Sequence, residues 1–463
     1  MKKKYVRWTL WTIASPFILF IILCILIYLP PIQNFLVDKA AVYASEATGM
    51  NISVGRISLS FPLNLVVTNV DAASPHNDTL LSVRRLQVNV QLLPLLKKQV
   101  EVDGISLQGA TVNSNDLIHG MKLNGTLGEL FISSHGVALD PETAIVNKVL
   151  LKDTDLSLCL NDTAAADTAA SDTTYWKIIL QDIDLQNVSF ALDMPLDSLS
   201  LAASLDNAIL RDGLIDLHKS AYSLQTFRIE NGRVRYDNGK PLAADSLSSG
   251  LDPSHIALTD IGVKLDSLYY EGRNMKAIIS QFVLKERSGV EIVSATGRMV
   301  SNDKVLRVPS LKLETRDSYL ELNAAMDWNA LDFKDEGLVS ARLMADIGKP
   351  DVVRFMGSMD EKFIRQYPSE PLRIRTGIDG DLNKLKLTTL TAELPGALGL
   401  FARGELTHLT DSLLRGGDIT LEAETKDLKF VSTLAEGIEI PYGTRLEGKF
   451  TMAGTKMLSL IHI

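Results

Sequence analysis

The chain has 463 residues, of which 46% are hydrophobic and 22% are charged, so it can bury a large apolar core and does not have the composition of a disordered polymer. Its formal net charge of -9 provides no excess of Lys and Arg to neutralise a phosphate backbone, which argues against nucleic acid as a partner. The two cysteines, Cys24 and Cys159, cannot build a disulfide framework or a cysteine-based metal site.

Residues 9–29 form an apolar segment, TLWTIASPFILFIILCILIYL, that contains no charged side chain. A helix of this length covers about 30 Å, which is the thickness of the hydrocarbon core of a membrane. The segment is followed by Pro30 and Pro31 rather than by a small-residue cleavage site, so we expect an uncleaved anchor. The positive charges in residues 1–8 predict that this tail is cytoplasmic and that the chain after Pro30 lies outside the cytoplasm.

Residues 31–49 have apolar positions at helical spacing, and Gly49 is suited to the left-handed conformation that closes a helix. From residue 50 onward, apolar and polar residues alternate, as in a strand with one covered face. The same alternation recurs over residues 50–350 and again over residues 370–457. The sequence therefore predicts a mainly β chain with few helices, and the turn signals between short strands favour antiparallel sheet.

Several apolar runs change parity partway along. Ile183 and Leu185 occupy odd positions, whereas Val188, Phe190 and Leu192 occupy even positions. Because successive side chains of a strand point to opposite faces, this change requires a bulge or a tight turn if one face is to remain apolar.

Three segments depart from the β pattern. Residues 351–369 include a helical pattern, DVVRFMGSMDEKFIRQY, which predicts a helical linker between two β regions. Residues 161–174 read NDTAAADTAASDTT, which predicts a flexible, solvated loop. Residues 458–463, LSLIHI, match what a sequencing adapter would encode, so we expect a non-native tail and a native sequence that ends near Met457.

No sequence motif predicts an active site, a cofactor or a metal. The histidines have no metal-ligand spacing, and no G-x-S-x-G motif is present. The segment Gly443–Lys449 has the spacing of a nucleotide-binding loop, but Phe450 follows it where a magnesium-binding Ser or Thr would be needed. We therefore expect that the protein is not an enzyme and that it has no cofactor-binding, catalytic or metal site.

The alternating apolar positions have two structural explanations. In a closed sandwich, the apolar faces of two sheets cover each other. In a curved sheet with an open face, the same side chains could hold acyl chains, because the hydrophobic effect does not distinguish a lipid tail from a facing sheet. The candidates for contact with acyl chains are Ile183, Leu185, Val188, Phe190 and Leu192, although the pattern leaves open which parity faces inward.

The first quarter of the chain carries a recognisable order of features. The apolar N-terminal segment is followed by a short helix that ends in SEATGMNISVGRISLSFPLNLVVTNVDAA, and then by TLLSVRRLQVNVQLLPLLKKQVEVDGISLQGATV. This order resembles the start of the AsmA/TamB family of envelope proteins, which belongs to the bridge-like lipid-transfer superfamily. The later segment FRIENGRVRYDNGKP is similar to the strand, Asn-Gly turn and strand unit that recurs in this family.

The resemblance implies a long curved antiparallel β-groove, called a β-taco, that projects from the inner membrane into the periplasm. It further implies that phospholipids are carried between the inner and outer membranes, with their acyl chains in the groove. The TamB branch implies a second role, as a scaffold for outer-membrane protein assembly and secretion that works with an outer-membrane barrel protein of the TamA/BamA type. Family members usually end in a C-terminal domain that meets the barrel, and we expect this sequence to be an N-terminal fragment without it.

Overall fold

The computed structural model describes most of the chain beyond the N-terminal segment. The described residues are 39, 41–42, 45–46, 48–60, 64–74, 78–91, 102–114, 120–138, 142–161, 175–240, 250–332, 337–356, 361–433, 442–453 and 456–462. The chain divides into two compact units, Met1–Asp197 and Ser198–Ile463. Both units consist mainly of β-strands, which confirms the predicted fold class at this level.

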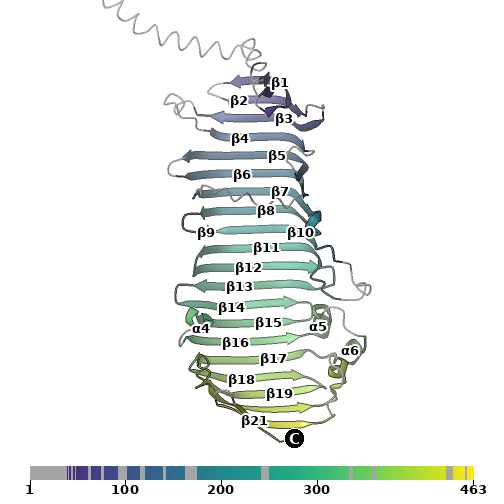
Figure 1. Ribbon diagram of the computed structural model, residues 1–463, viewed down its shortest axis with the longest axis vertical. Coiled ribbons are helices and arrows are strands. Elements are labelled where there is room, and N and C mark those ends of the chain that lie inside the picture. Colours follow the sequence, from purple (N-terminus) through teal and green to yellow (C-terminus); the bar gives the residue numbers. More distant parts are fainter. Residues whose placement is uncertain are drawn as a thin grey trace, which may run out of the picture. The chain divides into compact units, whose positions relative to one another are not determined.

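Unit 1 contains a sheet in which strands that are consecutive in sequence pair with each other (Figure 1). Its strands are β1 (Asn51–Ser60), β2 (Asn64–Ala73), β3 (Thr79–Val90), β4 (Val102–Asn113), β5 (Met121–Ala138), β6 (Thr143–Leu160) and β7 (Lys177–Met194). The pairs from β1–β2 to β5–β6 are antiparallel, as the sequence predicts.

The β6–β7 pair is parallel, which corrects the prediction of an antiparallel sheet at this point. Thr143 is opposite Lys177, and Cys159 is opposite Asp193, so both strands run in the same direction. A parallel pair needs a connection long enough to return to the start of the first strand. The polar segment predicted as a loop provides this connection, and its residues 162–174 lie outside the described residues.

The described part of the predicted helix at 31–49 agrees with the prediction. Lys39, Ala41 and Ser45 are helical, and Gly49 has a φ of 70°. The backbone N–H of Gly49 donates to the carbonyl oxygen of Ser45 at 2.9 Å, which closes the helix as expected. The predicted cytoplasmic tail at 1–8 and membrane segment at 9–29 lie outside the described residues, and no helix within the described part is long and apolar enough to span a membrane.

Unit 2 contains a second run of strands. They are β8 (Leu199–Asp216), β9 (Ala221–Leu224), β10 (Thr226–Asp237), β11 (His255–Glu271), β12 (Asn274–Glu286), β13 (Glu291–Ser301), β14 (Val305–Thr315), β15 (Tyr319–Asp327), β16 (Leu338–Ile347), β17 (Leu372–Asp381), β18 (Lys384–Leu394), β19 (Leu398–Thr407), β20 (Gly416–Thr425), β21 (Arg445–Ala453) and β22 (Lys456–His462). The short β9 and the following β10 lie end to end, because both pair with β8 on one side and with β11 on the other. From β10 to β22, consecutive strands pair antiparallel.

The predicted helical linker at 351–369 is present as two short helices, α5 (Lys349–Phe355) and α6 (Glu361–Gln366). They do not interrupt the sheet, because β16 and β17 on either side of them pair directly, with Ile347 opposite Leu372. A further short helix, α4 (Trp328–Asp332), was not predicted. Figure 1 shows α4 at one end of the strands of unit 2 and α5 and α6 at the other end.

The buried cores of unit 2 lie where these helices cover the strand ends. The larger cluster joins α6 to the short 3-10 helix η2 (Lys429–Thr433) and to the β18–β19 turn. Its buried members are Phe363, Tyr367, Leu394, Ala397, Leu428 and Phe430. The smaller cluster contains Ala330 of α4 with Val339 and Leu382. Burial is therefore concentrated near the ends of the strands rather than along their middle.

Candidate functional site

The strands of unit 1 align their apolar residues into continuous rows that run across the sheet. One row consists of Ile57, Val67, Leu86, Leu107, Leu130, Leu151 and Leu185. A second row consists of Val54, Val70, Val83, Ala110, Leu127, Thr154 and Val188. Residues directly opposite each other in a sheet point to the same face, so each row forms an apolar stripe from β1 to β7.

Two outer rows flank these inner rows. The first consists of Leu59, Leu65, Val88, Ile105, Ile132, Val149 and Ile183. The second consists of Ile52, Ala72, Leu81, Val112, Gly125, Leu156 and Phe190. We call these four rows together the apolar face of unit 1.

The five residues predicted to contact acyl chains all lie on β7 and continue this pattern. Ile183, Leu185, Val188 and Phe190 each end one of the four rows, and Leu192 is opposite Leu158 of β6. Phe190 is 39% exposed, and the other four side chains are half-buried. The structure therefore places the five residues in one strand and aligns each of them with an apolar neighbour, except Val188, whose neighbour is Thr154.

The parity change on β7 occurs at a left-handed residue, as the sequence analysis requires. Asn187 has a φ of 52°, and it lies between Leu185 and Val188. The register of β6 and β7 is the same on both sides of this level, so the left-handed residue re-aims the side chains that follow it without the extra residue of a β-bulge. Asn and Asp tolerate this conformation better than other residues with a side chain, which explains the residue type at this position.

Other strands of unit 1 have a left-handed residue at the same level of the sheet. Asn69 of β2, Gly109 of β4 and Asp153 of β6 have φ values of 52°, 61° and 49°. In each strand, the left-handed residue comes two positions after the member of the first inner row and directly before the member of the second inner row. The parity change is thus shared across the sheet, and sequence reasoning recognised it only in single strands.

The alternate positions of the strands carry polar side chains that bond to each other. The Ser82 hydroxyl donates to the Asp71 carboxylate at 2.6 Å, and the Ser189 hydroxyl donates to the Asp155 carboxylate at 2.5 Å. These residues neighbour the apolar rows in sequence and point to the opposite face. The sheet of unit 1 therefore has one hydrogen-bonded polar face and one aliphatic face.

Within the described part of unit 1, strands contact their neighbours in the sheet and no second layer of strands packs on the apolar face, so most of its side chains are half-buried. Of the described hydrophobic residues of unit 1, only Ala72, Leu80 and Val83 are buried, and Thr154 in the second row is buried as well. In a closed sandwich, a second sheet would pack about 10 Å away and bury the facing rows. The burial pattern therefore does not fit a closed sandwich over the described strands of this unit.

Unit 2 repeats the arrangement within its own sheet. One row follows consecutive strands from β12 to β21 and consists of Phe282, Ala295, Leu313, Leu320, Ala345, Ile374, Ala392, Leu400, Ala423 and Leu446. All of these positions are apolar, although the row crosses ten strands. Both units thus present aliphatic rows perpendicular to their strands.

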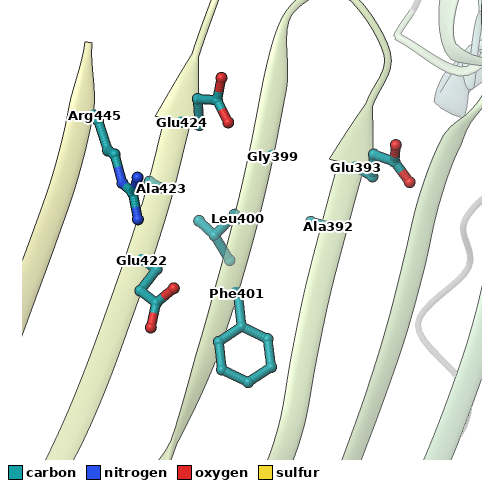
Figure 2. A pocket seen from close by; sticks show the side chains of 9 residues that line it. All are labelled: Ala392, Glu393, Gly399, Leu400, Phe401, Glu422, Ala423, Glu424 and Arg445. Carbon is teal, nitrogen blue, oxygen red and sulfur yellow. The ribbon is translucent and has the colours of Figure 1, made fainter.

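A shallow depression of about 370 Å³ lies in the sheet of unit 2 (Figure 2). Glu393, Gly399, Glu424 and Arg445 are opposite each other on successive strands and line it. Gly399 leaves open space, because a Cβ atom placed there would meet nothing within 4 Å. Glu393 lies 3.7 Å from the guanidinium of Arg373. The depression is open, and its lining combines these polar groups with Phe401 and with Ala392, Leu400 and Ala423 of the apolar row.

Two observations on the described residues concern metal binding and nucleotide binding. They contain no group of three His, Cys, Asp or Glu side chains that could hold a metal ion. The segment Gly443–Lys449 leads into strand β21 rather than into a helix, and Gly443 has a left-handed φ of 75°.

Comparison with known protein families found no family that matches this chain, and comparison with curated proteins found no match either. The resemblance to AsmA/TamB proteins therefore stays a prediction from sequence. The structural features that bear on function are the two faces of the sheets, one polar and one apolar.

Proposed function

We propose that the protein is an inner-membrane-anchored periplasmic carrier whose apolar sheet face holds phospholipid acyl chains between the inner and outer membranes. The observation that supports this most directly is the uncovered apolar face of unit 1, in which aliphatic residues of seven strands align into rows. A monomeric soluble protein rarely exposes a large contiguous apolar surface without a ligand or partner for it.

The energetic reason for such a face is the cost of exposing lipid tails to water. Each CH₂ group contributes about 0.8 kcal/mol, so two long chains meet a barrier on the order of 25 kcal/mol. Contact with aliphatic side chains replaces water around the tails and lowers this barrier. No catalytic residue or bound nucleotide is needed for that step.

The dimensions of the rows fit an acyl chain. Neighbouring strands lie about 4.8 Å apart, so a row across seven strands extends for roughly 29 Å. The hydrocarbon core of a bilayer is about 30 Å thick and is shared by two leaflets, so one chain reaches about 15 Å. An acyl chain is therefore shorter than a row of unit 1, and the whole acyl chain can lie along one row.

Photocrosslinking to lipid in cells tests this proposal. A photoreactive residue at each of Ile183, Leu185, Val188, Phe190 and Leu192 should capture phospholipid. The matched controls are the intervening polar-face positions of the same strand, Asp184, Ser189 and Ala191, which should capture little. Equal capture at both sets, or none at the five apolar positions, would contradict the proposal.

The anchor and compartment belong to the same proposal. They depend on the apolar segment at residues 9–29 and on the positive charges before it. Membrane fractionation and protease treatment of spheroplasts test them together. We expect the protein in the inner-membrane fraction, with unit 1 and unit 2 accessible to protease from the periplasmic side; cleavage only after the inner membrane is opened would contradict the orientation.

The alternative function is a scaffold for outer-membrane protein assembly, which would receive strands by addition to a sheet edge. Within the described residues, β1 pairs with no strand other than β2, but the backbone N–H of Ile52 on β1 already donates to the Ser45 hydroxyl oxygen at 3.0 Å. Pulldown of the full chain distinguishes the two functions. Recovery of an outer-membrane barrel protein of the TamA/BamA type without bound phospholipid would favour the scaffold, and recovery of phospholipid would favour the carrier.

A further inference from the structure

A buried histidine in unit 2 lies between two carboxylates. His255 begins β11 and is 7% exposed. Its Nδ1 atom lies 2.8 Å from the Oδ2 atom of Asp252, and its Nε2 atom lies 3.6 Å from the Oδ1 atom of Asp237. Asp237 ends β10, and Asp252 precedes β11 by three residues.

We propose that Asp237, Asp252 and His255 form a pH-sensitive clasp that tightens when His255 becomes protonated. A neutral imidazole carries one N–H and can donate to only one of the two carboxylates. With the proton on Nδ1 for Asp252, the lone pair on Nε2 faces Asp237. The protonated ring carries an N–H on both nitrogens and can donate to both carboxylates.

The described charged groups near His255 are three carboxylates and one guanidinium. Asp237 and Asp252 face the ring directly, and Glu286 at the end of β12 accepts a hydrogen bond from the backbone N–H of Ala257 at 3.2 Å. The guanidinium of Arg287 donates to the backbone carbonyl oxygen of His255 at 3.4 Å. Two of the carboxylates therefore contact the ring, whereas the guanidinium contacts the backbone.

Backbone hydrogen bonds also join the segments that carry Asp237, Asp252 and His255. The N–H of Asn238 donates to the carbonyl of Ser254 at 3.1 Å, and the N–H of His255 donates to the carbonyl of Asp252 at 3.0 Å. The hydrogen bond from His255 also holds the pKa of the Asp252 carboxyl below its ordinary value, so this carboxylate stays charged in mild acid.

The clasp also reaches helix α5. The N–H of Leu251 donates to the carbonyl oxygen of Arg354 at 2.8 Å, next to Asp252. The guanidinium of Arg354 in turn bonds to Asp317 at 2.8 Å and to Asp351 at 3.1 Å. A change at His255 can thus alter how firmly α5 is held against the β14–β15 turn.

Hydrogen exchange of the full chain, reconstituted in membrane, tests the proposal. Exchange is measured at pH 5.5 and at pH 8 and corrected for the intrinsic effect of pH on the amides. In the wild type, we expect peptides that cover residues 237–240 and 250–256 to exchange roughly fivefold more slowly at the lower pH. His255→Gln can bond to Asp252 but cannot acquire a charge, so it should lose this difference, whereas the control His218→Gln should retain it.

A second variant keeps the test decisive if His255→Gln is unstable. In Asp237→Asn, the side-chain amide can donate to the neutral Nε2 atom, so protection at pH 8 should rise toward the value at pH 5.5. The clasp would be refuted by a wild type without pH-dependent protection, by the same pH dependence in His255→Gln, or by no change at pH 8 in Asp237→Asn.

Discussion

The side-chain amide of Asn187 donates a hydrogen bond to the carboxylate of Asp153 at 2.9 Å, and both residues have left-handed backbones. They lie on the parallel strands β7 and β6, each at the point where the apolar residues change parity. Because both strands change parity at the same level, the apolar residues before and after this pair stay aligned between the strands. The continuity of the apolar face depends on the left-handed backbone of the two residues rather than on the exposed bond between them.

Replacing Asn187 tests the importance of its left-handed backbone. Asn187→Val should destabilise unit 1 by about 1–2 kcal/mol, because a β-branched residue is strained at a φ of 52°. Asn187→Gly should be close to neutral, since glycine adopts this conformation freely and the lost hydrogen bond is exposed. Urea unfolding of both variants measures the difference; equal stability of the valine and glycine variants would show that the left-handed backbone carries no strain.

A charge placed in an inner row tests the role of the apolar face. Val188→Asp puts a carboxylate opposite Thr154 in that row, so contact with an acyl chain would require its desolvation. We expect capture of phospholipid by a photoreactive residue at Leu185 to fall about tenfold or more, because one charge in apolar surroundings costs several kcal/mol.

The control for this variant is Gln186→Asp, on the same strand. Gln186 is opposite Lys152 outside the apolar rows, so the new carboxylate has a solvated partner. Lipid capture should remain near the wild-type level, and far-UV circular dichroism should show that both variants are folded. A similar loss in both variants would mean that added charge, rather than its place in the apolar face, lowers capture.

Sequence reasoning succeeded where structure depends on local pattern. Alternation along a single strand predicted the β class and a local change of backbone conformation between Leu185 and Val188, where Asn187 is left-handed. The closing residue Gly49 was also predictable, because its left-handed backbone depends on the helix that it ends. These features depend on neighbours in sequence.

Features that depend on distant partners were not predictable. The alignment of Leu185 with Leu151 and Leu130 depends on register, which no single strand encodes. The parallel direction of β7 depends on the path of the connection before it, and the sequence gives only the length of that connection. The packing of α6 depends on contact of Phe363 with Phe430, a residue that lies far along the chain.

A buried carboxylate fixes helix α5 and gives a prediction about stability. Asp351 is 1% exposed and accepts hydrogen bonds from the hydroxyls of Thr315 and Ser318, the latter at 2.6 Å. Asp351→Ala should lower the free energy of unfolding of unit 2 by about 3 kcal/mol, since it removes the carboxylate that accepts from both hydroxyls and one of the two carboxylates that bond to Arg354.

The matched control is Asp332→Ala, which removes the partner of Arg273 at a more exposed position. Exposed ion pairs contribute less than about 1 kcal/mol, so this variant should unfold close to the wild type. Thermal unfolding followed by circular dichroism compares the two. A loss of stability in Asp332→Ala as large as that in Asp351→Ala would contradict the assignment of α5 docking to Asp351.

The lowered pKa of Asp252 predicts how unit 2 responds to acid. The hydrogen bond from His255 is the main cause of the shift, and a backbone bond from Ser254 adds to it. Because the folded pKa lies below the unfolded value near 3.8, the carboxylate stabilises the fold above that value, and this contribution is lost as the pH falls through the folded pKa. Urea unfolding between pH 2 and 6 should show a shallower acid decline in Asp252→Asn than in the wild type; identical slopes would rule out this contribution.

The parallel register of β6 and β7 predicts a specific disulfide. Cys159 is a free cysteine and is opposite Asp193, so Asp193→Cys, with Cys24→Ser to remove the other thiol, should form a disulfide under mild oxidation. An antiparallel pair with the same ends would place residue 193 near the start of β6, where no cysteine is available. Gel mobility with and without reductant, together with peptide mapping, reports the bond.

The length of the connection between these strands sets a limit on how far it can be shortened. Paired residues Thr143 and Lys177 lie at one end, and Cys159 and Asp193 lie at the other, a separation along the strand of roughly 53 Å. Deleting eight residues between Asn161 and Tyr175 leaves a chain that can reach only about 30 Å. The deletion should abolish the disulfide between residue 159 and Asp193→Cys, whereas a Gly-Ser segment of the original length should preserve it. If the shortened chain still formed that disulfide, the length of the connection would not limit the pairing of β6 with β7.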